Sequence, residues 1–225
     1  MDNIMKFRNC IYFISLWLFI SSLFAEEPTK TPLFQDGKGY YSYKKPLDIL
    51  LPKDNKVLIT YFYQYGCEVC LNGDDYLKQY ASRHSDKVVL ERVAAFSENK
   101  YGITVSLNAL FSELGKPELS EKYLFDSSYQ NDRLITNGEA ITKWLNKHQI
   151  SLDTVEQVRK QENYPKRISQ NYELIKRYSP PVIPMAVLNG KYILTKSTLY
   201  NDDYTYAVLD FLVDKLQKEQ QGVTK

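Results

Sequence analysis

The chain has 225 residues, of which 44% are hydrophobic and 25% are charged, and its formal net charge is +2. This composition is ordinary for a globular protein, and the length favours one domain or one domain with an insertion. No block of like charge occurs, which argues against a nucleic-acid-binding protein.

Residues 1–25 have the pattern of a secretory signal peptide. Lys6 and Arg8 precede an uncharged run at residues 11–24, IYFISLWLFISSLF, and a small residue, Ala25, closes it. A membrane span needs roughly 20 apolar residues, and this run is shorter. Cleavage after Ala25 is therefore preferred over a membrane anchor.

The start of translation is open between Met1 and Met5, because Asp2 is unusual in a basic signal segment. Cleavage also removes Cys10, which precedes the apolar run and so does not have the position of a lipid-anchored cysteine. The mature chain keeps two cysteines, both in the tetrapeptide CEVC. An exported compartment permits disulfides.

The first half of the mature chain predicts two strands around one helix. Residues 26–55 predict a leader and a first hairpin, in which GYYSY has strand character. Residues 57–66, VLITYFYQYG, are β-branched and aromatic with little polar alternation, which predicts a strand buried on both faces. A helix follows, so Cys67 lies where a buried strand turns into a helix. Residues 87–96, KVVLERVAAF, predict a second strand.

Helical patterns then fill the chain to about residue 164. A first apolar stripe ends before Gly115 and Pro117 and consists of Leu107, Leu110, Phe111 and Leu114. A second begins after Asn137-Gly138 with Ile141, Trp144 and Leu145, and residues 151–161 predict a third helix. Core packing explains these stripes.

The last part predicts a helix, a hairpin and a terminal helix. YPKRISQNYELIKRYS is helical up to Pro180-Pro181. In VIPMAVLNGKYIL, Asn189-Gly190 stands between two apolar runs, which is the strongest short hairpin signal. An amphipathic helix ends the chain, with Asn201 or Asp202 as its cap.

The spacing of Cys67 and Cys70 fits a redox pair or half of a zinc site. Structural zinc needs four Cys or His ligands, and the mature chain adds only His84 and His148, neither in a paired motif and both expected on charged, exposed helix surfaces. We therefore expect no metal, and no other cofactor. A disulfide that closes so short a loop adds little stability, which favours chemistry over a structural role.

A dithiol at the start of a helix has a clear mechanism. The first N–H groups of the helix are unpaired and its dipole favours negative charge. Cys67 can therefore exist as a thiolate and exchange with a disulfide, and Cys70, one turn further on, can resolve the mixed disulfide. A Cys-x-x-Cys between a buried strand and a helix is a strong signal for this chemistry.

VLITYFYQYGCEVC, the helix after it and IPMAVLNGKY resemble the DsbA family of periplasmic disulfide oxidoreductases. The resemblance spans nearly the whole mature chain. It implies an α/β, thioredoxin-like fold in two parts, residues 26–103 and 165–225, with an inserted all-helical subdomain at residues 104–164. It also implies a cis Ile183-Pro184 bond beside the cysteines, where both residues would bind substrate.

The resemblance also implies partners. These are reduced exported proteins as substrates and a DsbB-like membrane protein as the reoxidant, with no nucleic acid, and the expected state is a monomer in the periplasm.

Two positions depart from the family pattern. The dipeptide between the cysteines, where the family usually has His, is Glu68-Val69, and we expect both residues to tune the redox chemistry. Six residues before Cys67, where thioredoxin-fold oxidoreductases commonly carry a buried acid, stands Tyr61. A phenol is a poor base at neutral pH, so Glu68 is a candidate substitute.

The favoured function is therefore a disulfide oxidase that acts through CEVC, with Tyr65, Gly66 and the hairpin at Asn189 expected along the substrate groove. A less oxidising reductase, or an exchange partner for a few substrates, is the alternative within the same chemistry. A peptide-binding or chaperone module with a static disulfide is the alternative outside it. An isomerase fits less well, because no separate dimerisation domain precedes the fold.

Overall fold

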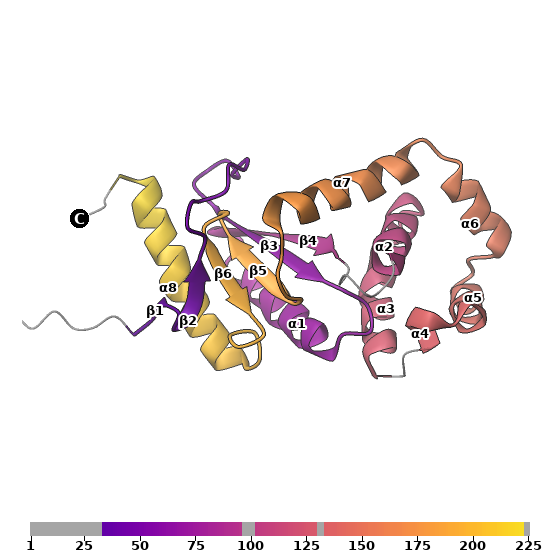
Figure 1. The fold of residues 1–225 in the computed structure, drawn as a ribbon, viewed down its shortest axis with the longest axis horizontal. Coiled ribbons are helices and arrows are strands. Elements are labelled where there is room, and N and C mark those ends of the chain that lie inside the picture. The colour runs from indigo at the N-terminus through magenta and orange to yellow at the C-terminus, as the bar shows by residue number, and fades with distance from the viewer. Residues whose placement is uncertain (1–32, 96–101, 130–132, 223–225) are drawn as a thin grey trace, which may run out of the picture. The chain divides into compact units, whose positions relative to one another are not determined.

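The computed structural model describes residues 33–95, 102–129 and 133–222, so the expected signal peptide lies outside the described residues. These residues form six strands and eight helices (Figure 1). The strands are β1 (Gln35–Asp36), β2 (Gly39–Ser42), β3 (Val57–Tyr63), β4 (Val88–Ala94), β5 (Met185–Leu188) and β6 (Tyr192–Thr195). The helices are α1 (Glu68–Arg83), α2 (Ile103–Glu113), α3 (Glu118–Tyr129), α4 (Arg133–Thr136), α5 (Gly138–Lys147), α6 (Leu152–Arg159), α7 (Asn163–Tyr178) and α8 (Asp202–Gln220).

The strands form one mixed sheet in the order β1-β2-β6-β5-β3-β4. β3 lies between β4, which is parallel to it, and β5, which is antiparallel. All seven residues of β3 are buried, which confirms the prediction of a strand covered on both faces. A strand in this position has both edges paired, so its carboxyl end is held rigidly at one end of the sheet.

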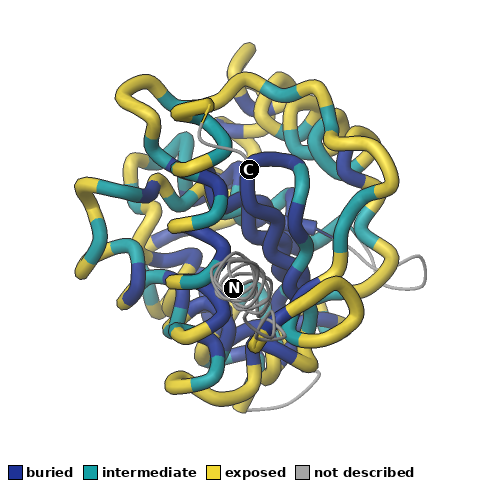
Figure 2. The backbone as a smooth tube through the Cα atoms, turned by 90° about the vertical axis from the view of Figure 1, so that its left-hand side faces the viewer, coloured by how far each residue is buried: buried dark blue, intermediate teal, exposed yellow. Residues whose placement is uncertain are grey.

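The two faces of the sheet are covered by different helices. Ile59, Tyr61 and Tyr63 of β3 point into a core that includes apolar residues of α1 and α8. Phe62 points to the opposite face, where it packs with Tyr178 of α7. Figure 2 shows the buried backbone running through the middle of the structure, with exposed segments around it.

The strand expected in GYYSY is confirmed as β2, but in the described part of residues 26–55, which begins at residue 33, β2 does not form the expected hairpin with the strand before it. β1 and β2 register in parallel, and the antiparallel partner of β2 is β6. The reason is side-chain packing: the Tyr40 ring contacts Tyr192 of β6 edge to face and stacks on Phe211 of α8. The two-residue β1 has no comparable apolar surface to offer.

Among the described residues between β4 and β5 there are six helices, and Figure 1 shows α2 to α6 grouped together, with α7 leading from them to β5. The sequence patterns predicted α2, α5, α6 and α7 but not α3 or α4. The subdomain boundaries at residues 104 and 164 stay a prediction; α2 begins at Ile103 and α7 at Asn163. Within the described ranges, no helix combines the length and the apolarity that crossing a membrane requires.

The predicted Asn189-Gly190 hairpin is confirmed between β5 and β6, and both turn residues have positive φ angles, 48° and 63°. The Asn189 side chain also accepts a 2.7 Å hydrogen bond from the backbone N–H of Leu58, at the beginning of β3. This turn therefore lies at the end of β3 opposite to the cysteines.

Replacing Asn189 by Ala should destabilise the fold and leave disulfide exchange nearly unchanged. The buried Leu58 N–H would lose its acceptor, which costs about 1–3 kcal/mol of unfolding free energy. Asn189→Asp keeps the acceptor and tolerates a positive φ, so it should retain most of the stability. Equilibrium denaturation and an exchange assay with a thiol peptide measure the two effects; a large loss of exchange in the folded Ala variant would contradict the placement.

Candidate active site

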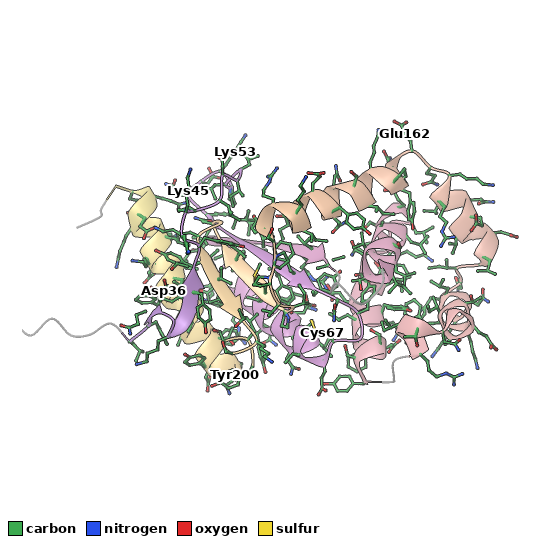
Figure 3. All side chains as sticks on the ribbon, viewed as in Figure 1. Asp36, Lys45, Lys53, Cys67, Glu162 and Tyr200 are labelled. Carbon is green, nitrogen blue, oxygen red and sulfur yellow. A yellow bond between two sulfur atoms is a disulfide. The ribbon has the colours of Figure 1, made fainter. Side chains whose placement is uncertain are left out.

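Cys67 and Cys70 form a disulfide at the junction between β3 and α1, with sulfurs 2.03 Å apart. Cys67 is the N-cap of α1, and its sulfur accepts a 3.2 Å hydrogen bond from the backbone N–H of Cys70. Cys67 is 8% exposed, whereas Cys70 is fully buried. Figure 3 labels Cys67 close to the start of α1. Of the two cysteines, Cys67 is therefore the less deeply buried.

The electrostatics of this junction favour a negative charge on Cys67. An N-cap side chain faces the unpaired N–H groups of the first helical turn, and the helix dipole adds a partial positive charge there. A sulfur that already accepts the Cys70 N–H in the disulfide can accept it as a thiolate as well. Cys67 is accordingly the better thiolate of the pair.

Glu68 and Val69 occupy the first turn of α1, between the cysteines, and both side chains are exposed. Glu68 is the acidic residue of that turn, where a carboxylate interacts favourably with the helix dipole. Its charge also lies next in sequence to the Cys67 sulfur, where it opposes a thiolate. Their tuning role stays a prediction.

The segment before β5 lies at the same end of the sheet as the cysteines. Met185, the first residue of β5, pairs with Phe62 near the end of β3. The peptide bond between Ile183 and Pro184 is cis, which is the isomer that the resemblance implies. Pro184 is buried, Ile183 is half-buried and Val182 is exposed, so this segment offers both backbone and apolar surface next to the sheet end.

Two expectations about the substrate groove are wrong. Tyr65 is 3% exposed, and its hydroxyl is hydrogen-bonded to Ser120 at 2.8 Å, because its ring is packed against Tyr123 in the core. The hairpin at Asn189 lies at the far end of β5. Both residues stabilise the fold, and neither lines a groove beside Cys67.

The loop between β3 and Cys67 is tied to the helical subdomain. The Tyr65 N–H donates to the Thr104 hydroxyl of α2 at 3.2 Å, and the exposed Gly66 donates its N–H to the Ser127 hydroxyl of α3 at 3.0 Å. Gly66 has a φ of 73°, and a Cβ there would lie 2.7 Å from Ile135 of α4. Glycine is therefore required where the helices approach the loop.

Tyr61 lies directly beneath the cysteine pair. It is fully buried, and its hydroxyl donates a 2.6 Å hydrogen bond to the backbone carbonyl of Cys70. A Cβ on Gly73 would lie 2.8 Å from this hydroxyl, so the glycine makes room for it. Burial, and then the negative charge of Asp74, hold the pKa of Tyr61 well above its ordinary value. Tyr61 is therefore a neutral donor and not a base.

The sequence reasoning missed an ion pair close to this site, in which the acid is buried and the cation is partly buried. Asp74 of α1 is 1% exposed and binds Arg92 of β4 through two hydrogen bonds, of 2.6 and 3.0 Å. Lys78 lies 3.2 Å from the same carboxylate. The available signal was helical spacing: Asp74 is four residues after Cys70 and three before Leu77, on the buried side of α1.

The two histidines lie in less exposed surroundings than predicted. Each is half-buried and contacts an aromatic ring one turn earlier: His84 contacts Tyr80, and His148 contacts Trp144. Burial, with Lys122 nearby, lowers the pKa of His148. In the part of the chain that the structure describes, no group of three or more His, Cys, Asp or Glu residues is arranged to hold a metal ion.

This arrangement defines a class of protein. A mixed sheet with a Cys-x-x-Cys disulfide after an interior strand, and a proline before the adjacent antiparallel strand, is the framework of a thiol:disulfide oxidoreductase with a thioredoxin-like fold. The helices between β4 and β5 are consistent with a helical insertion into that fold.

Comparisons with known proteins agree with this class. The chain is 34% identical over 193 residues to a Haemophilus influenzae protein described as uncharacterized, covering 85% of this chain and 81% of that one. It is 20% identical over 175 residues to the thiol:disulfide interchange protein DsbA of Azotobacter vinelandii, covering 78% of this chain and 82% of the relative. No protein-family model matches the sequence.

Solved DsbA structures share the fold. The oxidoreductase DsbA from Xylella fastidiosa matches with a TM-score of 0.66 at 18% identity, covering 82% of this chain and 98% of that chain. A DsbA oxidoreductase from Neisseria meningitidis matches with a TM-score of 0.67 at 19% identity, covering 85% and 98%. The chain is a DsbA-like thiol:disulfide oxidoreductase with a thioredoxin-like fold.

Tyr61→Phe tests the hydrogen bond under the cysteines. Because Tyr61 is a neutral donor to a carbonyl, losing its hydroxyl should cost about 0.5–1.5 kcal/mol of unfolding free energy. The pH dependence of exchange should keep its shape, since no proton-transfer group is removed. Denaturation of the oxidised protein and a pH–rate profile provide the measurements, and a profile that loses an ionisation would identify Tyr61 as a base after all.

Proposed function

We propose that this protein is an exported oxidase that introduces disulfide bonds into other exported proteins through Cys67 and Cys70. The observation that carries the proposal is the unequal setting of the two sulfurs at the N-terminus of α1: one is the partly accessible N-cap and the other is sealed. This asymmetry suits a donor disulfide that is attacked at one defined sulfur.

The reaction follows from this asymmetry. A substrate thiolate attacks the Cys67 sulfur, the Cys67–Cys70 bond breaks, and Cys70 leaves with the electron pair and takes up a proton. A second substrate thiolate then attacks the substrate sulfur of the mixed disulfide. Cys67 leaves as a thiolate that the start of α1 stabilises. The substrate loses two electrons and the enzyme gains them.

Substrate would bind along the segment that precedes β5. In this proposal the backbone of Ile183 faces an extended substrate strand, and Pro184 fixes the direction of that segment. Val69 and Val182, which are 39% and 45% exposed, supply apolar surface for the side chains of the substrate. An extended peptide in this position gains main-chain hydrogen bonds that do not depend on its sequence.

The periplasm is the compartment that we propose, because residues 1–25 have the pattern of a signal peptide. Reduced exported proteins would be the substrates, and a DsbB-like membrane protein would reoxidise the cysteines. A less oxidising reductase is the alternative, and the reduction potential separates the two. An oxidase lies near the oxidising end of the thioredoxin-fold range, and a reductase near thioredoxin.

Cys70→Ala should trap mixed disulfides with exported proteins, and Cys67→Ala should trap few or none. In the first variant the accessible sulfur still reacts but the resolving thiol is missing; in the second the remaining sulfur is buried. Non-reducing gels of cells that express each variant, followed by mass spectrometry of the cross-linked cysteine, provide the measurement. Equal trapping would remove the assignment of roles.

Glu68→Gln should raise the reduction potential by about 15–60 mV, because removing the carboxylate favours the Cys67 thiolate and hence the reduced form. The exposure of Glu68 favours the low end of this range. Glu68→His should raise the potential further, since a protonated imidazole attracts a thiolate.

Equilibration of each Glu68 variant with glutathione measures the potential. Glu118→Gln is the matched control, because Glu118 is likewise an acid in the first turn of its helix, α3. An unchanged reduction potential in Glu68→Gln would show that Glu68 only stabilises the N-terminus of α1 and does not tune the cysteines.

A further inference from the structure

Tyr61 leaves the cysteine pair without an acid on β3, but α1 supplies one. Cys70 and Asp74 are four residues apart on the same buried side of α1, which separates their Cβ atoms by about 5–6 Å. Side chains of an α-helix lean towards its N-terminus, so the Asp74 side chain leans towards the turn that carries Cys70. The Tyr61 hydroxyl fills the adjacent space against Gly73.

The Asp74 carboxylate belongs to a network of charged groups on β4, α1 and α3. Burial raises the pKa of Asp74, and the charges of Arg92 and Lys78 act in the opposite direction. Arg92 of β4 binds this carboxylate through two hydrogen bonds, and Lys78 lies one turn further along α1. Glu121 of α3 contacts both cations, at 3.0 Å from Lys78 and 3.6 Å from Arg92. The other titratable groups around the network are Asp75 on α1 and Tyr61 and Tyr63 on β3, the Tyr63 ring lying under Arg92 at 4.9 Å.

We propose that the Asp74–Arg92 ion pair controls the ionisation of Cys70, with the buried Asp74 carboxylate favouring the protonated thiol of Cys70 before it resolves a mixed disulfide. The inference rests on the roles of Cys67 and Cys70 proposed above. Asp74 does not contact the substrate in this proposal; its negative charge acts only on the ionisation of Cys70. It stands in for the strand acid whose place Tyr61 occupies, but from the helix side and with its charge balanced by Arg92.

The affected step is the resolving step. With Cys67 bound to a partner sulfur, the Cys70 thiol releases its proton to solvent, and the resulting thiolate attacks the Cys67 sulfur. The Cys67–Cys70 bond forms, the bond from Cys67 to the partner sulfur breaks, and the partner leaves as a thiolate with the electron pair. A carboxylate near Cys70 opposes the loss of the proton from its thiol. It also makes the resulting thiolate a stronger nucleophile towards the Cys67 sulfur.

The test follows resolution of the mixed disulfide between Cys67 and glutathione, from about pH 5 to pH 10. The reduced protein is mixed with oxidised glutathione, quenched in acid at short times and analysed by mass spectrometry. Removing a unit charge about 6 Å from a thiol, with an effective dielectric constant between roughly 20 and 80, shifts the pKa of that thiol by about 0.5–2 units. Asp74→Asn should lower the pH midpoint of resolution by that amount.

The rates should change in opposite directions at the two ends of the profile. For a shift of about one pH unit and a Brønsted coefficient of about 0.4–0.5, Asp74→Asn should resolve about threefold to fourfold faster below the midpoint. On the high-pH plateau it should be about threefold slower, because the thiolate is a weaker nucleophile. A purely structural loss would lower the rate at every pH.

Two further variants keep the test decisive. Asp75→Asn removes the same charge from the neighbouring exposed position and should leave the midpoint unchanged. The double variant Asp74→Asn/Arg92→Gln removes both charges of the pair and should return the midpoint towards that of the wild type. The double variant also leaves no unpaired Arg92, so it can be measured if Asp74→Asn folds poorly.

An unchanged midpoint in Asp74→Asn, or a double variant that keeps the shifted midpoint, would overturn the inference. Glutathione found on Cys70 instead of Cys67 in the wild-type protein would overturn the proposed roles of the cysteines themselves. The two failures are therefore distinguishable within one experiment.

Discussion

The hydrogen bond from the Cys70 N–H to the Cys67 sulfur is the interaction on which the site depends. It exists because β3, buried on both faces and paired along both edges, delivers Cys67 to the start of α1 in extended conformation. Cys67, at the helix start, keeps a small exposed fraction of 8%, whereas Cys70, one turn further on, is fully buried. The difference in reactivity between the cysteines is thus a consequence of where a strand ends and a helix begins.

The helical insertion contributes to the site through hydroxyl groups. Thr104 and Ser127 accept the N–H groups of Tyr65 and Gly66, so the residues just before Cys67 are held from outside the thioredoxin-like part. The hydroxyl of Ser120 on α3 also forms hydrogen bonds with the hydroxyls of both Tyr63 and Tyr65. Buried polar groups that are paired in this way fix one arrangement of two surfaces, whereas apolar contacts alone tolerate sliding.

The sequence was sufficient where local patterns determine structure and insufficient where polar side chains are buried by distant partners. The apolar run of β3, the helix after Cys67 and the Asn189-Gly190 turn each follow from short-range rules. The sequence pattern did not predict helix α3, because the buried face of this helix includes two polar residues, Ser120 and Ser127. Their hydroxyl groups bind tyrosine hydroxyls and a backbone N–H instead of packing against apolar side chains. The prediction that Tyr65 lines the substrate groove was wrong for the same reason, because the hydrogen-bond partner of its hydroxyl, Ser120, is remote in sequence.

The burial of Asp74 could not be predicted from the sequence either. The residues around it in α1 are those of an exposed, charged helix, and only the fold brings Arg92 of β4 into contact with it. The neighbouring residues form a consistent set around it. A tyrosine at position 61 needs space, which Gly73 provides, and its neutral hydroxyl leaves Arg92 without an anionic partner on β3. Arg92 is only 19% exposed, and its other carboxylate contact, with Glu121, is longer at 3.6 Å, so a missing partner near β3 would carry a desolvation penalty. A carboxylate on the adjacent turn of α1 removes that penalty, and helical spacing then places its charge one turn from Cys70. The identity of residue 61, the glycine and the ion pair are therefore parts of one solution to burying charge beside a disulfide.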